Sequence, residues 1–93
     1  MSWRSQFSSD YCVPQAILDL VEVGRLKDVS CQIDPCPSFQ FHDMTLWVDA
    51  ENESRRITPH SPRFIISYYA HETRHDIFLT DDLQELIQFL HRT

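Results

Sequence analysis

Two histidines and a glutamate stand close together in the stretch His71-Glu72-Thr73-Arg74-His75. On a helix, side chains four residues apart lie on one face about one turn apart, so that both imidazoles could reach one zinc ion. The intervening carboxylate could then polarise a metal-bound water for hydrolysis. This chemistry requires a helix, so the elements around the stretch decide whether it can occur.

The residues on both sides of this stretch favour strands. Residues 64–69 and 76–79 are rich in β-branched and aromatic side chains, which suit a pleated sheet. We therefore expect a hairpin that bends at Glu72-Thr73. The stretch is similar to the HExxH signature of zinc peptidases over five residues only.

In such a hairpin the two histidines diverge. His71 would lie opposite Arg74, while His75 would lie opposite Ala70 on the other face of the sheet. In one straight strand the two histidines would be about 13 Å apart, too far for a common zinc. His71 and His75 remain the metal candidates of this segment, but we predict no metal, no cofactor and no catalytic residue.

The cysteines offer a second set of metal-ligating groups. Cys31, Cys36 and His42 follow one another at short spacing, but they lack a fourth ligand and the tight Cys-x2-Cys pair of small zinc sites. With Cys12 the chain has three cysteines, and an odd count leaves at least one free thiol. We expect a reducing cytoplasm and a Cys31 that is buried in a strand.

The composition indicates one small acidic domain. The chain has 93 residues, with 14 acidic against 8 basic side chains and a net charge of -6. This surplus repels a phosphate backbone, so we expect no direct nucleic-acid binding. No apolar run approaches the roughly 20 residues of a membrane span, and the start lacks the apolar core of a signal peptide. Residues 1–93 should form a single domain, with a polar lead-in at 1–12 that need not be ordered.

Two helices are expected near the ends of the chain. Residues 13–24 carry Pro14 where a first turn would begin and Gly24 where a helix would end. Residues 80–92 begin with Thr80 as a cap, with acidic side chains in the first turn and basic ones in the last. Apolar residues at helical spacing form a face on this second helix that should bury against a sheet.

An antiparallel meander of four to five strands is expected between the helices. Residues 28–34 alternate as a half-buried strand, and Phe39 and Phe41 could add a short edge strand. Bends at Asn52-Glu53, within residues 59–62 and at Glu72-Thr73 would bring apolar residues opposite one another. The predicted fold class is α+β, with a short N-terminal helix and a C-terminal helix packed on the sheet.

The expected registers place apolar side chains on both faces of the meander. The core face would hold Leu46, Val48, Ile57, Phe64, Ile66, Tyr68, Ile77 and Leu79. The second face would hold Trp47, Ile65, Tyr69 and Phe78, together with Thr58, Ser67 and Arg56. An antiparallel sheet in a small domain usually leaves one face polar. Either the first helix or the N-terminal segment, with Trp3 and Phe7, covers this second face, or it is an aromatic patch that binds a partner.

The expected function is that of a non-enzymatic protein-binding module or small regulator. The predicted partner-binding residues are Trp47, Ile65, Tyr69 and Phe78 of the aromatic patch and Asp49, Glu51 and Glu53 of an acidic run. The acidic surface would steer a partner with a basic face, and a second copy of the chain is another candidate partner. Asp49 is also expected opposite Arg56 as a cross-strand ion pair.

Two alternatives stay open. One is an inhibitor of the immunity or anti-defence type that blocks a basic site with the same carboxylates. The other, from a different class, is a zinc-dependent hydrolase that uses His71, Glu72 and His75.

Overall fold

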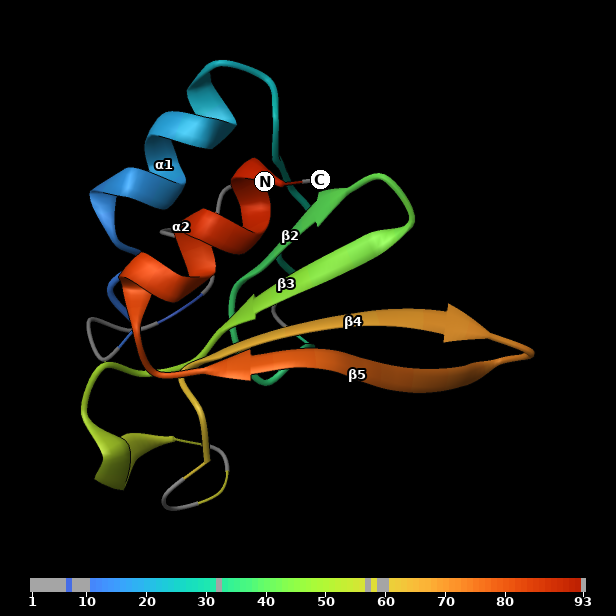
Figure 1. Ribbon diagram of the computed structural model, residues 1–93. Coiled ribbons are helices and arrows are strands. Elements are labelled where there is room, and N and C mark those ends of the chain that lie inside the picture. Colours follow the sequence, from blue (N-terminus) through green and yellow to red (C-terminus); the bar gives the residue numbers. More distant parts are fainter. Residues whose placement is uncertain (1–6, 8–10, 32, 57, 59–60, 93) are drawn as a thin grey trace.

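The computed structural model describes residues 7, 11–31, 33–56, 58 and 61–92. In these residues it has two α-helices and a five-stranded antiparallel sheet in the order β1-β2-β3-β4-β5 (Figure 1). The elements are α1 (Gln15–Glu22), β1 (Lys27–Asp28), β2 (Ser38–Phe41), β3 (Met44–Val48), a 3₁₀ helix (Glu53–Arg55), β4 (Phe64–Ala70), β5 (Thr73–Thr80) and α2 (Leu83–His91). The α+β fold class is confirmed. Most of the expected lead-in at residues 1–12 lies outside the described residues.

Helix α1 ends where a glycine permits a left-handed residue. Gly24 has a φ of +82°. The N–H groups of Gly24 and Arg25 donate to the carbonyls of Val21 (3.1 Å) and Leu20 (2.9 Å), which is the hydrogen-bond pair of a Schellman motif. Ile17 faces inward and is fully buried. The expected helix at 13–24 is therefore present, but it is shorter at both ends.

Helix α2 begins at Leu83, and its cap, Asp82, lies two residues after the expected cap, Thr80. The side chain of Asp82 accepts a hydrogen bond from the N–H of Gln84 at 2.8 Å and caps the helix. Thr80 ends β5, and its hydroxyl accepts from the N–H of Asp82 and donates to the Glu85 carboxylate at 2.6 Å. The apolar face of α2 buries as expected.

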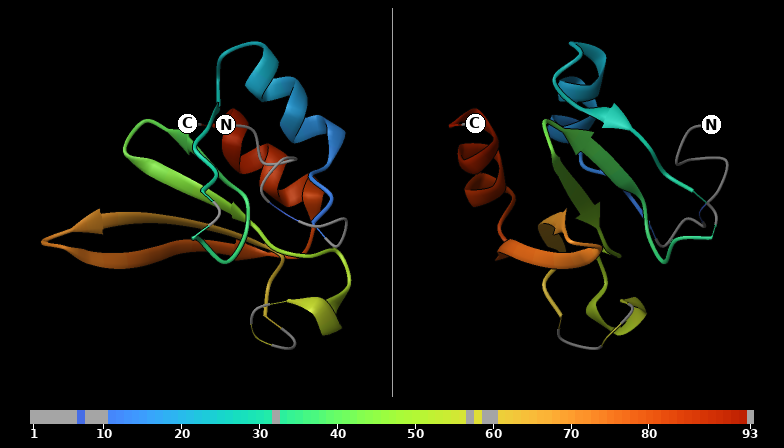
Figure 2. Two further views of the ribbon diagram at one scale, coloured as in Figure 1. Left: turned by 180° about the vertical axis from the view of Figure 1, so that it is seen from behind. Right: turned by 90° about the vertical axis from the view of Figure 1, so that its right-hand side faces the viewer.

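Both helices lie on one side of the sheet, with α1 and α2 side by side (Figures 1 and 2). One hydrophobic core lies between the two layers. It consists of Val13, Ile17, Leu26, Phe39, Phe41, Leu46, Val48, Phe64, Ile66, Leu86 and Leu90. Of the predicted core face, Leu46, Val48, Phe64 and Ile66 are buried. Among the described residues, no helix is long and apolar enough to cross a membrane.

The prediction of a strand at residues 28–34 is wrong. Only Lys27 and Asp28 pair with β2, and Ile33 is 86% exposed. The Asp28 carboxylate accepts a hydrogen bond from the N–H of Ser30. The Ser30 hydroxyl donates to the backbone carbonyl of Ser38 and accepts from the backbone N–H of Ser38. These hydrogen bonds from side chains to the backbone compete with regular backbone pairing between strands, so β1 ends at Asp28.

The prediction of a hairpin that bends at Asn52-Glu53 is also wrong. Strand β3 pairs with β2 on one side and with β4 on the other, so Val48 lies opposite Phe64 and not opposite Ile57. The described residues between β3 and β4 form a loop in which Asn52 caps the 3₁₀ helix through its side chain. Ile57 and half of the bend expected at 59–62, residues 59 and 60, lie outside the described residues.

The β4–β5 hairpin is present, but its register differs from the expected one. Ala70 pairs with Thr73, so the bend lies at His71-Glu72, whose φ values of +54° and +65° suit a two-residue hairpin turn. Tyr68 therefore lies opposite His75 rather than opposite Ile77.

A β-bulge then changes which face the last residues of β5 occupy. Ser67 pairs with Asp76 and Ile66 with Phe78, so Ile77 is the extra residue. Phe78 consequently lies on the core side, and Leu79 lies opposite Ile65 on the other side. The faces predicted for Phe78 and Leu79 were wrong because one inserted residue reverses every side chain after it. Ile77 and Leu79, expected in the core, are exposed.

Candidate functional site

The HETRH stretch forms the tip of the β4–β5 hairpin. His71 and Glu72 are the exposed turn residues, and β5 begins at Thr73. Arg74 lies on the side of the sheet away from the helices, whereas His75 lies on the opposite face and stacks on Tyr68 at a ring distance of 5.0 Å. The expected faces of Arg74 and His75 are confirmed, although their partners differ. The segment is strand, turn and strand, and it does not adopt the helical geometry that HExxH chemistry requires.

Metal-ligating groups do not converge in the part of the chain that the structure describes. No group of three or more His, Cys, Asp or Glu residues there could hold a metal ion. Cys31 lies in the turn after β1, and Cys36 is buried in the loop before β2. Burial, with the Asp49 carboxylate nearby, raises the pKa of the Cys36 thiol to about 12. Cys36 is therefore a neutral thiol at ordinary pH.

The side of the sheet away from the helices carries the candidate site, which we call the outer face. Its members are Trp47, Ile65, Tyr69, Arg74 and Leu79. Trp47, Ile65 and Leu79 form one cross-strand row over β3, β4 and β5, and Tyr69 lies opposite Arg74 nearer the tip.

Trp47 is held in place from two directions. Its indole Nε1–H donates to the hydroxyl of Ser67 at 2.9 Å. The guanidinium of Arg74 lies over the Trp47 ring at 5.1 Å, a cation–π distance, and its Nε donates to the Asp76 carboxylate at 2.8 Å. The centre of the outer face is thus an ordered aromatic and arginine pair.

The outer face is partly covered. Pro35 and Cys36 share a small cavity of about 30 Å³ with Trp47, Ile65 and Arg74. Two members at separate places on the face are more exposed: Tyr69, near the hairpin tip, is 59% exposed, and Leu79, on the edge strand β5 opposite Ile65, is 50% exposed.

The cover proposed for this face from the sequence was a helix or the N-terminal segment. Helix α1 does not supply it, because α1 packs through Ile17 in the core on the other side of the sheet. Trp3 lies outside the described residues.

Phe78 does not belong to the outer face, although the sequence placed it there. It stacks on Phe89 of α2 with ring centroids 4.5 Å apart. The bulge at Ile77 turns Phe78 inward and brings Leu79 to the position that Phe78 was expected to fill. Leu79 and Arg74 are the two members that the sequence did not place in the site.

The acidic run offers two exposed carboxylates rather than three. Glu51 and Glu53 are exposed on the loop after β3. Asp49 is only 5% exposed, and its carboxylate accepts from the N–H of Ala50 at 2.7 Å. Asp49 was expected opposite Arg56 as an exposed cross-strand pair, but the hairpin that would align them is not formed and both side chains are buried.

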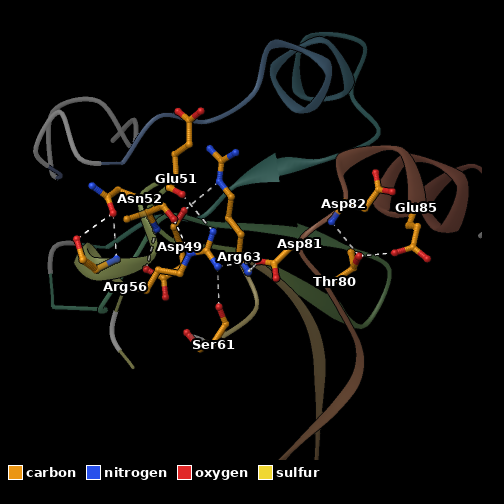
Figure 3. A network of polar contacts seen from close by, with 12 residues as sticks. Asp49, Glu51, Asn52, Arg56, Ser61, Arg63, Thr80, Asp81, Asp82 and Glu85 are labelled. Carbon is orange, nitrogen blue, oxygen red and sulfur yellow. Dashed lines mark hydrogen bonds and ion pairs between the residues drawn. The ribbon is translucent and has the colours of Figure 1, made fainter. Parts of the chain in front are cut away.

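Arg56 organises the loop that carries Glu51 and Glu53 (Figure 3). Its guanidinium is buried and forms an ion pair with Asp81 at 2.7 Å. It also donates to the carbonyls of Ala50 (2.8 Å), Ser61 (2.7 Å) and Glu51 (3.2 Å). Asp81 in turn accepts from the backbone N–H of Arg63, which ties the end of the loop to the start of α2.

Comparisons with known proteins return no relative: no family model, no curated protein and no solved structure matches the chain. Function is therefore argued from the geometry of the chain itself.

Proposed function

We propose that the chain is a non-enzymatic protein-binding module that contacts its partner through the outer face. The observation that carries this proposal is the exposure of Tyr69 and Leu79, each half or more exposed, on a side of the sheet that neither helix covers. Leu79 continues the cross-strand row of Trp47 and Ile65, and apolar side chains grouped on one face of a small folded chain are typical of interaction surfaces.

The chemistry of the outer face suits a protein interface. Aromatic residues and arginine are enriched at the centres of interfaces and carry much of the binding free energy. Trp47 and Arg74 are already ordered by their mutual stacking and by Ser67 and Asp76. Less side-chain entropy is then lost when a partner binds.

The position of the face within the molecule also favours binding. The distal part of the β4–β5 hairpin extends beyond the two helices (Figures 1 and 2), so a partner can approach Tyr69 without meeting them. The loop with Glu51 and Glu53 begins at Asp49, which lines the same small cavity as Trp47 and Arg74. A partner with an apolar centre and basic groups beside it would complement this arrangement.

The test is quantitative capture of proteins from the native cell lysate with three immobilised forms of the chain. The double variant Tyr69→Thr/Leu79→Thr removes the two most exposed apolar side chains of the outer face and places β-branched residues in the strands. Tyr68→Thr is the matched control, because Tyr68 is adjacent in sequence, 36% exposed and on the opposite face of the hairpin.

We expect the double variant to lose roughly 10-fold or more of the protein captured by the parent chain, as for the loss of two interface anchors. The control should retain it. If the double variant captures the same protein in the same amount, the outer face is not the binding surface. Sedimentation of the free chain distinguishes a second copy from a different partner.

A further inference from the structure

A cavity of about 400 Å³ is lined by residues at and just beyond the C-terminal ends of α1, α2 and β2. The ends of these elements can be followed in Figure 1. A cavity of this size is within the range of sites for small organic molecules. It is lined by Leu20, Gly24, Arg25, Leu26, Phe41, His42, Leu90 and His91. It shares no residue with the outer face.

The cavity has an apolar floor. Leu26, Phe41 and Leu90 are each less than one-tenth exposed and belong to the hydrophobic core, so their positions are fixed by packing. Leu20 is half-buried beside them. The floor can therefore desolvate an apolar group without having to rearrange.

The rim of the cavity is basic. Arg25, His42 and His91 are exposed, and none of the eight lining residues is acidic. The whole chain has 14 acidic against 8 basic side chains. Among the residues that line the cavity, Arg25 supplies a positive charge and none supplies a negative one, so the mouth complements an anion.

The guanidinium of Arg25 has N–H groups that could bind a ligand. The one hydrogen bond described for it is long, 3.5 Å to the carbonyl of Leu90. The nearby end of α1 does not require it, because the carbonyls of Leu20 and Val21 accept from the backbone N–H groups of Arg25 and Gly24. A guanidinium fork binds a carboxylate through two parallel hydrogen bonds.

We infer that this cavity binds a small organic acid, a monocarboxylate with an apolar body such as a phenyl ring on a short chain. The carboxylate pairs with Arg25 at the rim, where the imidazoles of His42 and His91 are further polar partners. The apolar body occupies the floor over Leu26 and Phe41. A hydrated inorganic anion would leave this floor unused, and an amine would meet the basic rim.

The test is an NMR titration of the ¹⁵N-labelled full chain with four probes: 4-phenylbutyrate, 4-phenylbutanol, 4-phenylbutylamine and inorganic phosphate. We expect 4-phenylbutyrate to shift the amides of Leu26, Phe41 and His42, and to bind roughly 10-fold or more tightly than the alcohol, as for one charge-assisted contact. The amine and phosphate should leave these amides unmoved at the same concentrations.

Variants assign the selectivity to the rim. Arg25→Gln should weaken binding of 4-phenylbutyrate by roughly 10-fold. Arg55→Gln, an exposed arginine in the 3₁₀ helix, is the matched control and should leave binding unchanged. His42→Asn is a second variant in the rim, since asparagine tolerates the φ of +50° at this turn position, and it should also weaken binding.

Three results would overturn the inference. Equal binding of the acid and the alcohol would show that the rim does not select a carboxylate. Equal shifts with phosphate would show a site for anions in general. An absence of shifts at the lining amides with 4-phenylbutyrate would show that the cavity does not take this class of ligand. None of these results bears on the outer face, which is tested separately.

Discussion

Arg56 shows how one side chain can hold a loop that lacks regular structure. Its guanidinium replaces the hydrogen bonds that a hairpin would have provided for the carbonyls of Ala50, Glu51 and Ser61. The sequence suggested an exposed pair between Arg56 and Asp49. It could not reveal the actual partners, because backbone carbonyls are present at every residue and leave no pattern in the chain.

We expect Arg56→Leu to lower the free energy of unfolding by about 2–3 kcal/mol, because buried carbonyls lose their donor and Asp81 loses its cation. Urea denaturation measures this change. Arg55→Leu is the neighbouring control and should change the free energy by less than about 0.5 kcal/mol, because Arg55 is exposed. Equal effects of the two substitutions would contradict the role given to Arg56.

Cys36 is the residue whose protonation depends most clearly on the fold. Burial raises the pKa of its thiol from 9.0 to about 12, and thiolates rather than thiols react with iodoacetamide. At pH 8 the folded chain should therefore be alkylated at exposed Cys12 and spared at Cys36. Mass spectrometry of the labelled peptides checks this, and equal labelling of the two residues would show that Cys36 is accessible.

The same raised pKa predicts a loss of stability in alkali. Below about pH 9 the thiol is neutral in both states, so its contribution is fully present. Between about pH 9 and pH 12 the unfolded chain releases this proton and the folded chain does not, so stability falls as the pH rises. Cys36→Ala should make this decline less steep, and an unchanged slope in urea titrations at these pH values would contradict the assignment.

At the scale of elements, alternation predicted the faces of β3, of β4 and of the start of β5, but not those of the β5 residues after the bulge. Within a regular strand successive side chains point to opposite faces, so Leu46 and Trp47 were placed correctly. The bulge at Ile77 interrupts this rule, and no residue near it has a type that marks a bulge. In the segment 28–34 the alternation was present, but side-chain bonds from Asp28 and Ser30 to the backbone displaced the strand.

The bulge predicts how β5 responds to the deletion of a single residue. Deleting Ile77 should leave the pairs Ser67–Asp76 and Ile66–Phe78 intact, since Ile77 is the residue between them without a register partner. We expect the free energy of unfolding to change by about 1 kcal/mol or less. Deleting Leu79 instead should lower the free energy of unfolding several times more, because this deletion shifts Thr80 and the start of α2 relative to the sheet.

Urea denaturation measures both deletions, and NMR contacts between Ile66 and Phe78 report whether their pairing is kept. Unfolding of the Ile77 deletion would show that the bulge is required for the fold.

At the scale of the whole molecule, the two helices cover one side of the sheet and neither of them covers the other side. In the described part of the chain, a loop lies against part of that other side. The sequence predicted an apolar second face and named Trp47, Ile65 and Tyr69 correctly as its members. It left open what covers that face, because long-range packing of a helix on either side of a sheet satisfies the same local pattern. The fold resolves this for α1, and the outer face, on which Tyr69 and Leu79 are exposed, remains as the proposed contact surface.

The measurement that tests this proposal most directly is site-specific photocrosslinking in the native cell. The photoreactive residue benzoylphenylalanine replaces Tyr69 in one form of the chain and Tyr68 in the other, so that the same aromatic probe points to opposite faces of one hairpin. We predict a discrete crosslinked protein, identified by mass spectrometry, from position 69 and not from position 68. Crosslinking from position 68 alone, or from neither position while the chain is folded, would contradict the claim that the outer face binds a partner.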